Sequence, residues 1–338
     1  MKVLAVISII LVVVGLVIGF IALASSGFDL QNTEKRVSES FTLTEEIRSL
    51  EINTTDTSLD VIIKKGTQES VTLDIVRKET QTVDYSVSDG KLSVGTSKIK
   101  NWFANLFNFG YGTAITVTLP EKEYERLSVR TSAGDVRISG FTFSGDVSIN
   151  TSSGDVRLAS INADSLCAST TSGEIEITRA KAVNAFSLNA TSGDIDVSEI
   201  IANKLSVDGT SSDIEIDKAT LGSIDKITTT SGEIELSEVL TTGTVVIKTT
   251  SGDTKIEGST FGGKLLFDSA SGEFEMQSSD AAQLDIDTSS GDVTLLLLSP
   301  KNFVTHTSSG RVRVNGSLYT APLCEVHTSS GDIEINIK

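Results

Sequence analysis

Apolar residues two positions apart recur through the last two-thirds of the chain, and polar residues lie between them. In one copy, Leu166 and Ala168 precede a Ser-Gly-Glu turn, and Ile175 and Ile177 follow it. A period of two places alternate side chains on the same face of a β-strand. Each copy therefore predicts a strand, a turn and a second strand, with both strands buried on one face.

The turn between the two strands recurs at a nearly fixed interval. It reads Ser-Gly-Asp/Glu or a close variant, and we call the residue after the glycine position the anchor. The anchors are residues 135, 155, 174, 194, 213, 233, 253, 273, 292, 311 and 332, so successive anchors lie 19 to 21 residues apart. Such a period is typical of stacked repeats, each too short to bury its own apolar face. It predicts an all-β fold, a single-stranded β-solenoid whose coils of roughly twenty residues lie about 4.8 Å apart.

The turn residues have separate expected roles. The glycine is expected to supply a positive φ, and Ser and Asp are expected to bond to nearby backbone groups. Ser212 replaces the glycine in one copy, which predicts a strained or differently shaped turn. Threonines four residues before the anchor are expected to stack into a hydroxyl ladder; they are Thr131, Thr151, Thr170, Thr229, Thr249, Thr288, Thr307 and Thr328.

The regular β-solenoid is expected over residues 127–338, because the motif is strict there. Residues 41–126 are expected to form an N-terminal β cap with degenerate coils, including a strand-turn-strand coil at Tyr85–Val94. A cap is needed because an open strand edge invites aggregation. The chain stops at Ile335–Lys338 without an evident cap. This predicts a C-terminal edge that could pair with a second copy of the chain.

An apolar or small-residue run, Val3–Ala24, follows Lys2 at the start of the chain. It is long enough to span a bilayer, and longer than the apolar region of most signal peptides. We therefore favour a transmembrane anchor at residues 1–24 over a cleaved signal segment, with residues 25–40 as a juxtamembrane linker. Lys2 predicts that the N-terminus stays inside. The bulk of this single-pass protein is then expected on the extracytoplasmic side of the cell membrane.

The charge balance narrows the choice of partners. The chain of 338 residues has a net charge of −17, which argues against nucleic acid and anionic lipid surfaces and favours cationic partners or divalent ions. The two cysteines lie eight coils apart, too far for a disulfide. Cys324 is expected to fill apolar space in the core.

One candidate metal site is a column of side chains near the C-terminus. His306 and His327 both precede their anchors by five residues, and Asp287 and Asp268 hold the same position in the two preceding coils. Such a column could ligate a transition metal. A solvated ladder of surface side chains is the simpler interpretation.

A second candidate is the longer column of acidic anchors, in which Asp194, Asp213 and Glu233 occupy the middle. Like charges directly opposite in a sheet repel each other, and a divalent ion such as calcium would relieve that repulsion. Solvated turn carboxylates, with no bound ion, are the simpler interpretation here as well.

The aromatic segment Trp102–Tyr111 interrupts the β pattern and contains the chain's single tryptophan. The spacing of Trp102, Phe103 and Phe107 fits a short amphipathic helical turn. This segment is expected either to plug the end of the solenoid or to expose a contact patch for lipid or a partner.

Motifs of known enzyme classes are not found in the sequence. It contains neither a Gly-x-Ser-x-Gly elbow nor a phosphate-binding glycine loop, and we expect a non-catalytic protein without a cofactor. A polysaccharide-active enzyme is a weaker alternative, because solenoid enzymes that act on acidic polysaccharides usually need a basic groove and this surface is acidic.

The segments Ile115–Pro120 and Leu127–Val136, followed by serial Thr-Ser-Gly-Asp/Glu coils, resemble the bacterial putative-adhesin domain of unknown function. LiaG-like and YvlB-like envelope proteins carry this domain, and the resemblance covers roughly residues 41–338. It implies an adhesin-like binding or structural module of the cell envelope, with a cell-wall or envelope component as partner. A self-associating envelope scaffold and a stress-related envelope protein are the alternatives.

Overall fold

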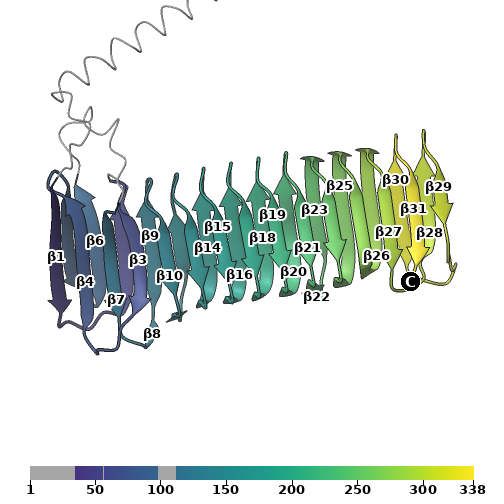
Figure 1. Ribbon diagram of the computed structural model, residues 1–338. Coiled ribbons are helices and arrows are strands. Elements are labelled where there is room, and N and C mark those ends of the chain that lie inside the picture. The colour runs from purple at the N-terminus through teal and green to yellow at the C-terminus, as the bar shows by residue number, and fades with distance from the viewer. Residues whose placement is uncertain (1–34, 56, 98–111) are drawn as a thin grey trace, which may run out of the picture.

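A computed structural model of the protein describes residues 35–55, 57–97 and 112–338. These residues form strands and turns without a helix, arranged as a straight β-solenoid of about 11 turns. Figure 1 shows a rod in which the chain advances by one coil at a time over most of its length. The predicted all-β solenoid is therefore confirmed.

Each regular coil contributes one strand to sheet A, directly after the anchor, and one to sheet B, directly before the turn. Sheet A contains β3 (Asp60–Lys65), β10 (Val136–Ser139), β13 (Val156–Ala159), β15 (Ile175–Thr178), β17 (Ile195–Ser198), β19 (Ile214–Asp217), β21 (Ile234–Ser237), β24 (Thr254–Glu257), β27 (Val293–Leu297), β31 (Ile333–Ile337) and β29 (Val312–Val314). Sheet B contains β2 (Ser49–Thr54), β9 (Arg126–Thr131), β12 (Val147–Asn150), β14 (Asn162–Thr170), β16 (Lys181–Ala190), β18 (Ile201–Gly209), β20 (Thr220–Thr229), β23 (Val245–Ser251), β25 (Thr260–Ser271), β30 (Leu323–Thr328) and β28 (Asn302–Thr307), with the short strands β8 (Glu123–Tyr124), β11 (Thr142–Phe143) and β22 (Leu240–Thr241). The long β26 (Phe274–Ser290) runs through both sheets.

The core lies between the two sheets and is built from the predicted apolar pairs. Neighbouring coils pair parallel and in register, as in Ile175 with Ile195 and Leu188 with Val207. These side chains are 0% exposed. The burial pattern alternates along the strands, so the predicted inward and outward positions are confirmed.

A second corner of the coil lies five residues after the anchor. Gly140 and Gly258 occupy it with positive φ, as do non-glycine residues such as Arg179 and Glu238, with φ of 53° and 52°. A left-handed backbone residue turns the chain sharply at the end of each sheet A strand. This corner was not predicted from the sequence, because most of its residues are not glycine.

The N-terminal cap consists of antiparallel strands. Strand β1 (Arg36–Leu43) pairs with β4 (Val71–Lys78), β4 pairs with β7 (Ala114–Leu119), and β5 (Thr82–Ser88) forms a hairpin with β6 (Lys91–Ser97). The segment expected to be a degenerate coil at Tyr85–Val94 is this hairpin, because Asp89 and Gly90 both have the positive φ of a tight hairpin turn. Residues 36–40, expected in the linker, belong to β1.

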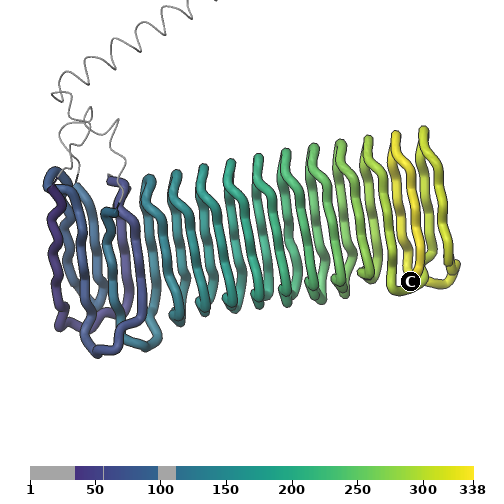
Figure 2. Tube along the Cα trace, viewed as in Figure 1, coloured from purple at the N-terminus to yellow at the C-terminus, as the bar shows by residue number. Residues whose placement is uncertain are grey.

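The last two coils do not follow chain order. Strands β30 and β31 lie between the coil of β26 and β27 and the coil of β28 and β29, which occupies the end of the rod. Figure 2 shows the end of the chain next to, rather than at, the last coil. The C-terminal edge expected at Ile335–Lys338 was wrongly placed, because β31 is paired on both sides. Among the described strands, those paired on one side only at this end of the rod are β28 and β29.

A buried ion pair fixes the crossover that produces this order. Lys301, between β27 and β28, has a side chain that is 3% exposed, and its Nζ lies 2.7 Å from Oδ1 of Asp280. Its Nζ also donates to Ser299 Oγ at 2.7 Å. A charged amine this deeply buried needs such partners, because an unpaired one would cost several kcal/mol.

Candidate binding face on sheet A

The anchor carboxylates lie in a row along the corner that leads into sheet A. Asp213 has its Oδ1 2.8 Å from the backbone nitrogen of Glu233, the anchor of the next coil, and accepts that N–H. Asp135 accepts the N–H of Asp155 and Asp194 that of Asp213, each at 3.1 Å. The aspartates therefore bind successive coils together, which gives this part of the motif a structural role.

Aspartate and glutamate are not equivalent in this row. The bridge is formed from Asp60, Asp135, Asp155, Asp194, Asp213, Asp253, Asp292 and Asp332. Within the described residues, the bridge is absent where the anchor is a glutamate: the N–H of the next anchor is not accepted by Glu174, Glu233 or Glu273. The extra methylene of glutamate moves its carboxylate away from the amide of the next coil. Asp60 begins the row from a degenerate coil, and its position just before the apolar Val61 and Ile63 was the available sequence signal.

The turn glycines serve close packing instead of a positive φ. Among the glycines of this turn, Gly272 alone has φ in the left-handed region, at +143°. A Cβ on Gly154, Gly173 or Gly193 would come closer than 3.0 Å to the backbone carbonyl of the glycine one coil before. The expected role of the glycine is therefore corrected: consecutive turns stack so tightly that a side chain has no room.

Ser212 replaces the turn glycine without opening a gap. It is fully buried, and its Oγ donates to the carbonyl of Ala190 at 3.2 Å. Residue 209, where most copies have Thr, is Gly, and a Cβ there would lie 3.0 Å from the Cβ of Ser212. The serine thus fills the space that the threonine occupies elsewhere, so the altered turn is compensated within its own coil.

The expected threonine ladder is present in part. Thr170 Oγ1 accepts the N–H of Gly173 at 2.9 Å and donates to the carbonyl of Gly154 at 3.4 Å. Thr131 and Thr151 accept the corresponding glycine N–H. In other coils, such as that of Thr249, the hydroxyl has no partner among the described residues.

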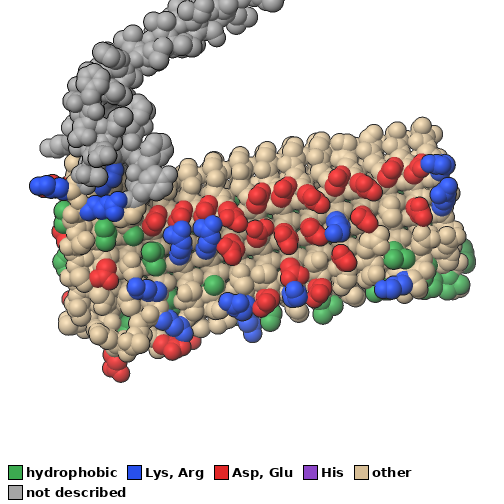
Figure 3. All heavy atoms as spheres, in the orientation of Figure 1, with side chains coloured by type: hydrophobic (Ala, Val, Ile, Leu, Met, Phe, Trp, Pro, Cys, Tyr) green, Lys and Arg blue, Asp and Glu red, His purple; other side chains and the backbone are tan. Residues whose placement is uncertain are grey.

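A second row of carboxylates lies on the outer face of sheet A, two residues after the anchors. Glu176, Asp196, Glu215 and Glu235 are direct neighbours in the parallel register. Figure 3 shows such rows of acidic side chains along one face of the rod, interrupted by a few basic ones. This second row and the anchor row together form the surface that we call the acidic face.

Basic residues neutralise the two ends of the second row but not its middle. Arg157 Nε lies 3.2 Å from Glu176, and Lys255 Nζ lies 3.0 Å from Glu235. Within the described residues, Asp196 and Glu215 have no salt bridge to Lys or Arg. Together with Glu174, Asp217 and neighbouring side chains they line a shallow groove of about 390 Å³.

Asp196 is the side chain most affected by this crowding. Its partial burial, the hydrogen bond from its carboxyl group to Glu174, and the charges of Glu174, Glu215 and Asp194 raise its pKa to about 6. Burial and the charges of Asp253 and Asp292 raise the pKa of Glu273 as well. The acidic face therefore holds unrelieved negative charge at neutral pH, which a cation would stabilise.

The histidine column has a different order from the one expected. Asp287 pairs with His327, and His306 lies beyond His327, because the last two coils are exchanged. The two imidazole rings are 6.2 Å apart between centroids. No group of three or more His, Cys, Asp or Glu in the described parts of the chain is placed to hold a metal ion. Metal binding by His306, His327 and Asp287 stays a prediction.

Divalent binding by Asp194, Asp213 and Glu233 also stays a prediction. One carboxylate oxygen of Asp194 and one of Asp213 already accept a backbone N–H, which leaves fewer oxygens for an ion. Cys324 is buried in the core as expected, and burial raises the pKa of its thiol to about 12. Trp102, Phe103 and Phe107 lie outside the described residues.

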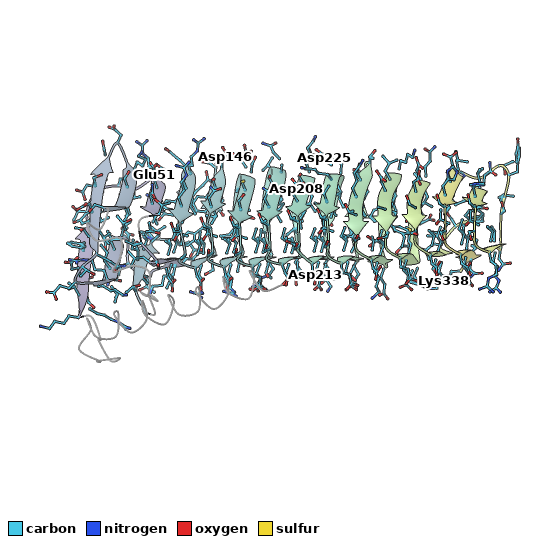
Figure 4. All side chains as sticks on the ribbon, turned by 90° about the horizontal axis from the view of Figure 1, so that it is seen from above. Glu51, Asp146, Asp208, Asp213, Asp225 and Lys338 are labelled. Carbon is cyan, nitrogen blue, oxygen red and sulfur yellow. The ribbon has the colours of Figure 1, made fainter. Side chains whose placement is uncertain are left out.

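The opposite face differs in its charge pattern. Figure 4 shows Asp213 on one side of the rod and Asp146, Asp208 and Asp225 on the other. On this sheet B side, Asp208 pairs with Lys226, and Asp225 lies 2.9 Å from Lys204. Carboxylates there are largely neutralised by basic neighbours, so the accumulation of unpaired charge is specific to the sheet A side.

The arrangement of repeats matches one family over most of the chain. The pattern of the Toastrack DUF4097 family matches residues 47–239 and 224–338. The chain belongs to this family. None of the curated proteins compared with this Toastrack chain matches it.

Solved structures similar to this Toastrack protein include a putative adhesin from Bacteroides fragilis, with 17% identity and a TM-score of 0.41, covering 73% of this chain and 98% of that one. A putative adhesin from Parabacteroides merdae has 13% identity and a TM-score of 0.39, covering 74% and 97%. A putative lipid binding protein from Parabacteroides distasonis has 14% identity and a TM-score of 0.39, covering 89% and 97%.

Proposed function

We propose that this Toastrack protein is a non-catalytic binding module of the cell envelope, presented outside the membrane, and that its acidic face contacts a cationic partner. One observation supports this most strongly. The face is periodic, and its middle carries Asp196 and Glu215, which within the described residues have no salt bridge to Lys or Arg and accept no backbone N–H of a neighbouring coil. The LiaG-like arrangement, with an N-terminal anchor before the repeats, is part of the same proposal.

The position relative to the membrane rests on the sequence. Val3–Ala24 lies outside the described residues, and no helix within those residues is long and apolar enough to cross a bilayer. The proposed anchor at residues 1–24 would hold the rod at the outer surface of the cell membrane. Exported domains at that surface encounter cell-wall polymers, some of which carry amino groups.

The test is capture by an envelope fraction from the cells that produce the protein. In one triple variant, E176Q, D196N and E215Q remove three consecutive carboxylates of the second row. In the matched control, D208N, D225N and D285N remove three carboxylates on the sheet B side, so the net charge changes equally. We expect the first variant to lose capture and the control to keep it. Equal capture of both variants would contradict the proposal.

A further inference from the structure

The end of the rod at β28 and β29 has open edges in both sheets. Strand β28 pairs with β30 alone, and β29 with β31 alone, among the strands that the structure describes. Asn302 donates its N–H to Pro322, on the β30 side. Because residues alternate in a parallel ladder, the N–H and C=O groups of Phe303, Thr305 and Thr307 point away from the rod.

The same alternation applies to the other sheet. The carbonyl of Arg311 and the N–H of Asn315 bond to β31. The backbone groups of Val312 and Val314 therefore point outward. Natural sheet edges are usually blunted by charged residues or proline. Neither strand contains proline, and Arg313 is the one Lys, Arg, Asp or Glu in the two strands.

The core is also incompletely covered at this end. Val312 occupies an inward position, in register with the buried Ile333, yet it is 43% exposed. Phe303 and Val314 are only partly buried. At the N-terminal end, the rings of Phe41 and Tyr85 lie 4.8 Å apart against the core, and Tyr85 is 37% exposed.

We infer that this end binds the same end of a second copy of the chain, to form a two-fold symmetric, head-to-head dimer. The two strands of the last coil run in opposite directions. A two-fold axis that is perpendicular to the rod and passes through both sheets places β28 antiparallel to its symmetry mate and β29 antiparallel to its own. One rotation thus pairs both open edges at once and closes the assembly at two copies.

The register follows from the three outward residues of β28. If Thr305 lies opposite itself across the axis, Phe303 lies opposite Thr307 of the second copy, and all three residues gain backbone bonds. Phe303 and Val312 would then be covered by the corresponding end of the other core. This dimer is independent of the acidic face, which stays exposed along both rods.

The charge at this end suits such a contact. Along the rod the anchors are acidic, but the last coil has Arg311 at the anchor position, and Arg311 Nη2 lies 2.9 Å from Asp332. Because the two-fold axis reverses the strand direction, the anchor row of the second copy lies at the opposite edge of sheet A, and the two acidic rows do not meet at the junction. Arginine in place of an acidic anchor also lowers the negative charge of the end that is joined.

Cross-linking of the full chain tests the proposal. Across an antiparallel hydrogen-bonded pair, the Cα atoms lie about 5.5 Å apart, within the range of a disulfide. Under mild oxidation we expect T305C to give a covalent dimer on a non-reducing gel, and S206C, on the outer face of sheet B, to give none. Absence of the T305C dimer, or an equal yield from S206C, would overturn the inference.

A second variant tests the edge without a cross-link. Thr305→Pro removes an N–H that the fold itself does not use, so the coil is expected to stay paired with β30. Sedimentation of the full chain in a mild detergent should show a dimer for the wild type and a monomer for T305P. A wild type that is monomeric at about 100 µM, or a T305P protein that is still dimeric, would show that this edge is not the interface.

Discussion

Single carboxylates of this protein have different tasks that depend on their position relative to the turn. The anchor aspartates accept a backbone N–H from the next coil, as Asp213 does from Glu233 at 2.8 Å. The carboxylates two residues later, such as Asp196 and Glu215, point from the outer face of sheet A and are crowded by others of the same charge. The first row stabilises the stack and the second row destabilises it.

The inter-coil bond of the anchors predicts the outcome of a pair of substitutions. Asp213→Ala removes the acceptor for the Glu233 amide and should lower the free energy of unfolding by about 0.5–1.5 kcal/mol. Asp213→Asn keeps an oxygen at the same place and removes one negative charge, so its stability should match or exceed that of the wild type. Urea unfolding followed by circular dichroism measures both. Equal loss in both variants would mean that charge, and not the hydrogen bond, is what matters there.

The raised pKa of Asp196 predicts an unusual dependence of stability on pH. Its pKa rises from 3.8 to about 6 on folding, so its protonated form favours the folded state. That contribution is complete below the unfolded pKa and is lost as the pH rises through the folded value. We expect Asp196→Asn to raise the unfolding temperature at about pH 7 and to have little effect at about pH 4. The same benefit at both pH values would argue against a shifted carboxyl group.

At the scale of the elements, the coil is defined by which side chains fill the space between consecutive turns. The strands were predictable, because the alternation of Leu166 and Ala168, or of Ile175 and Ile177, has a single satisfactory arrangement. The reason for glycine in the turn was not predictable, because glycine suits both a positive φ and a close approach of two backbones. Only the positions of neighbouring coils distinguish these two roles.

The order of the last two coils could not be predicted for a related reason. The coils resemble one another in the spacing of their strands, so the repeat pattern alone does not show whether β28 or β30 pairs with β26. The crossover contains a contact that the repeat pattern does not predict, Lys301 with Asp280 at 2.7 Å. The sequence predicted the candidate site as a row of anchors. It did not predict the bonds from the anchors to backbone amides or the groove around Asp196, because both depend on how neighbouring coils lie against one another.

One coil has Gly209 where most coils have threonine and Ser212 where they have glycine, and this pair predicts the outcome of two substitutions. Gly209→Thr alone places a side chain against Ser212 and should destabilise the protein by about 1–3 kcal/mol. The double variant Gly209→Thr/Ser212→Gly restores the arrangement of the other coils and should recover most of that loss. Thermal unfolding of the two variants and the wild type provides the comparison. If the double variant is no more stable than Gly209→Thr, the two positions are not coupled.

At the scale of the whole molecule, the fold is a rod with two distinct faces and two distinct ends. The sheet A side carries unrelieved negative charge, and the sheet B side pairs its carboxylates with lysines. The edge strands at the N-terminal end are β1 and β5, which belong to antiparallel pairs, whereas those at the other end are β28 and β29, which belong to parallel pairs. A rod of this kind offers a repeating contact surface along its length and a joining surface at one end.

The affinity of the full chain for oligolysine, a cationic probe, tests the central claim most directly. The triple variant E176Q/D196N/E215Q removes three of the four carboxylates named for the second row while leaving every anchor bond in place, and D208N/D225N/D285N serves as the control of equal net charge. The account predicts that the first variant binds at least about tenfold more weakly, a difference of about 1.4 kcal/mol, whereas the control binds nearly as the wild type does. Equal weakening of both variants would show that oligolysine responds to overall charge, and that the acidic face is not a binding surface.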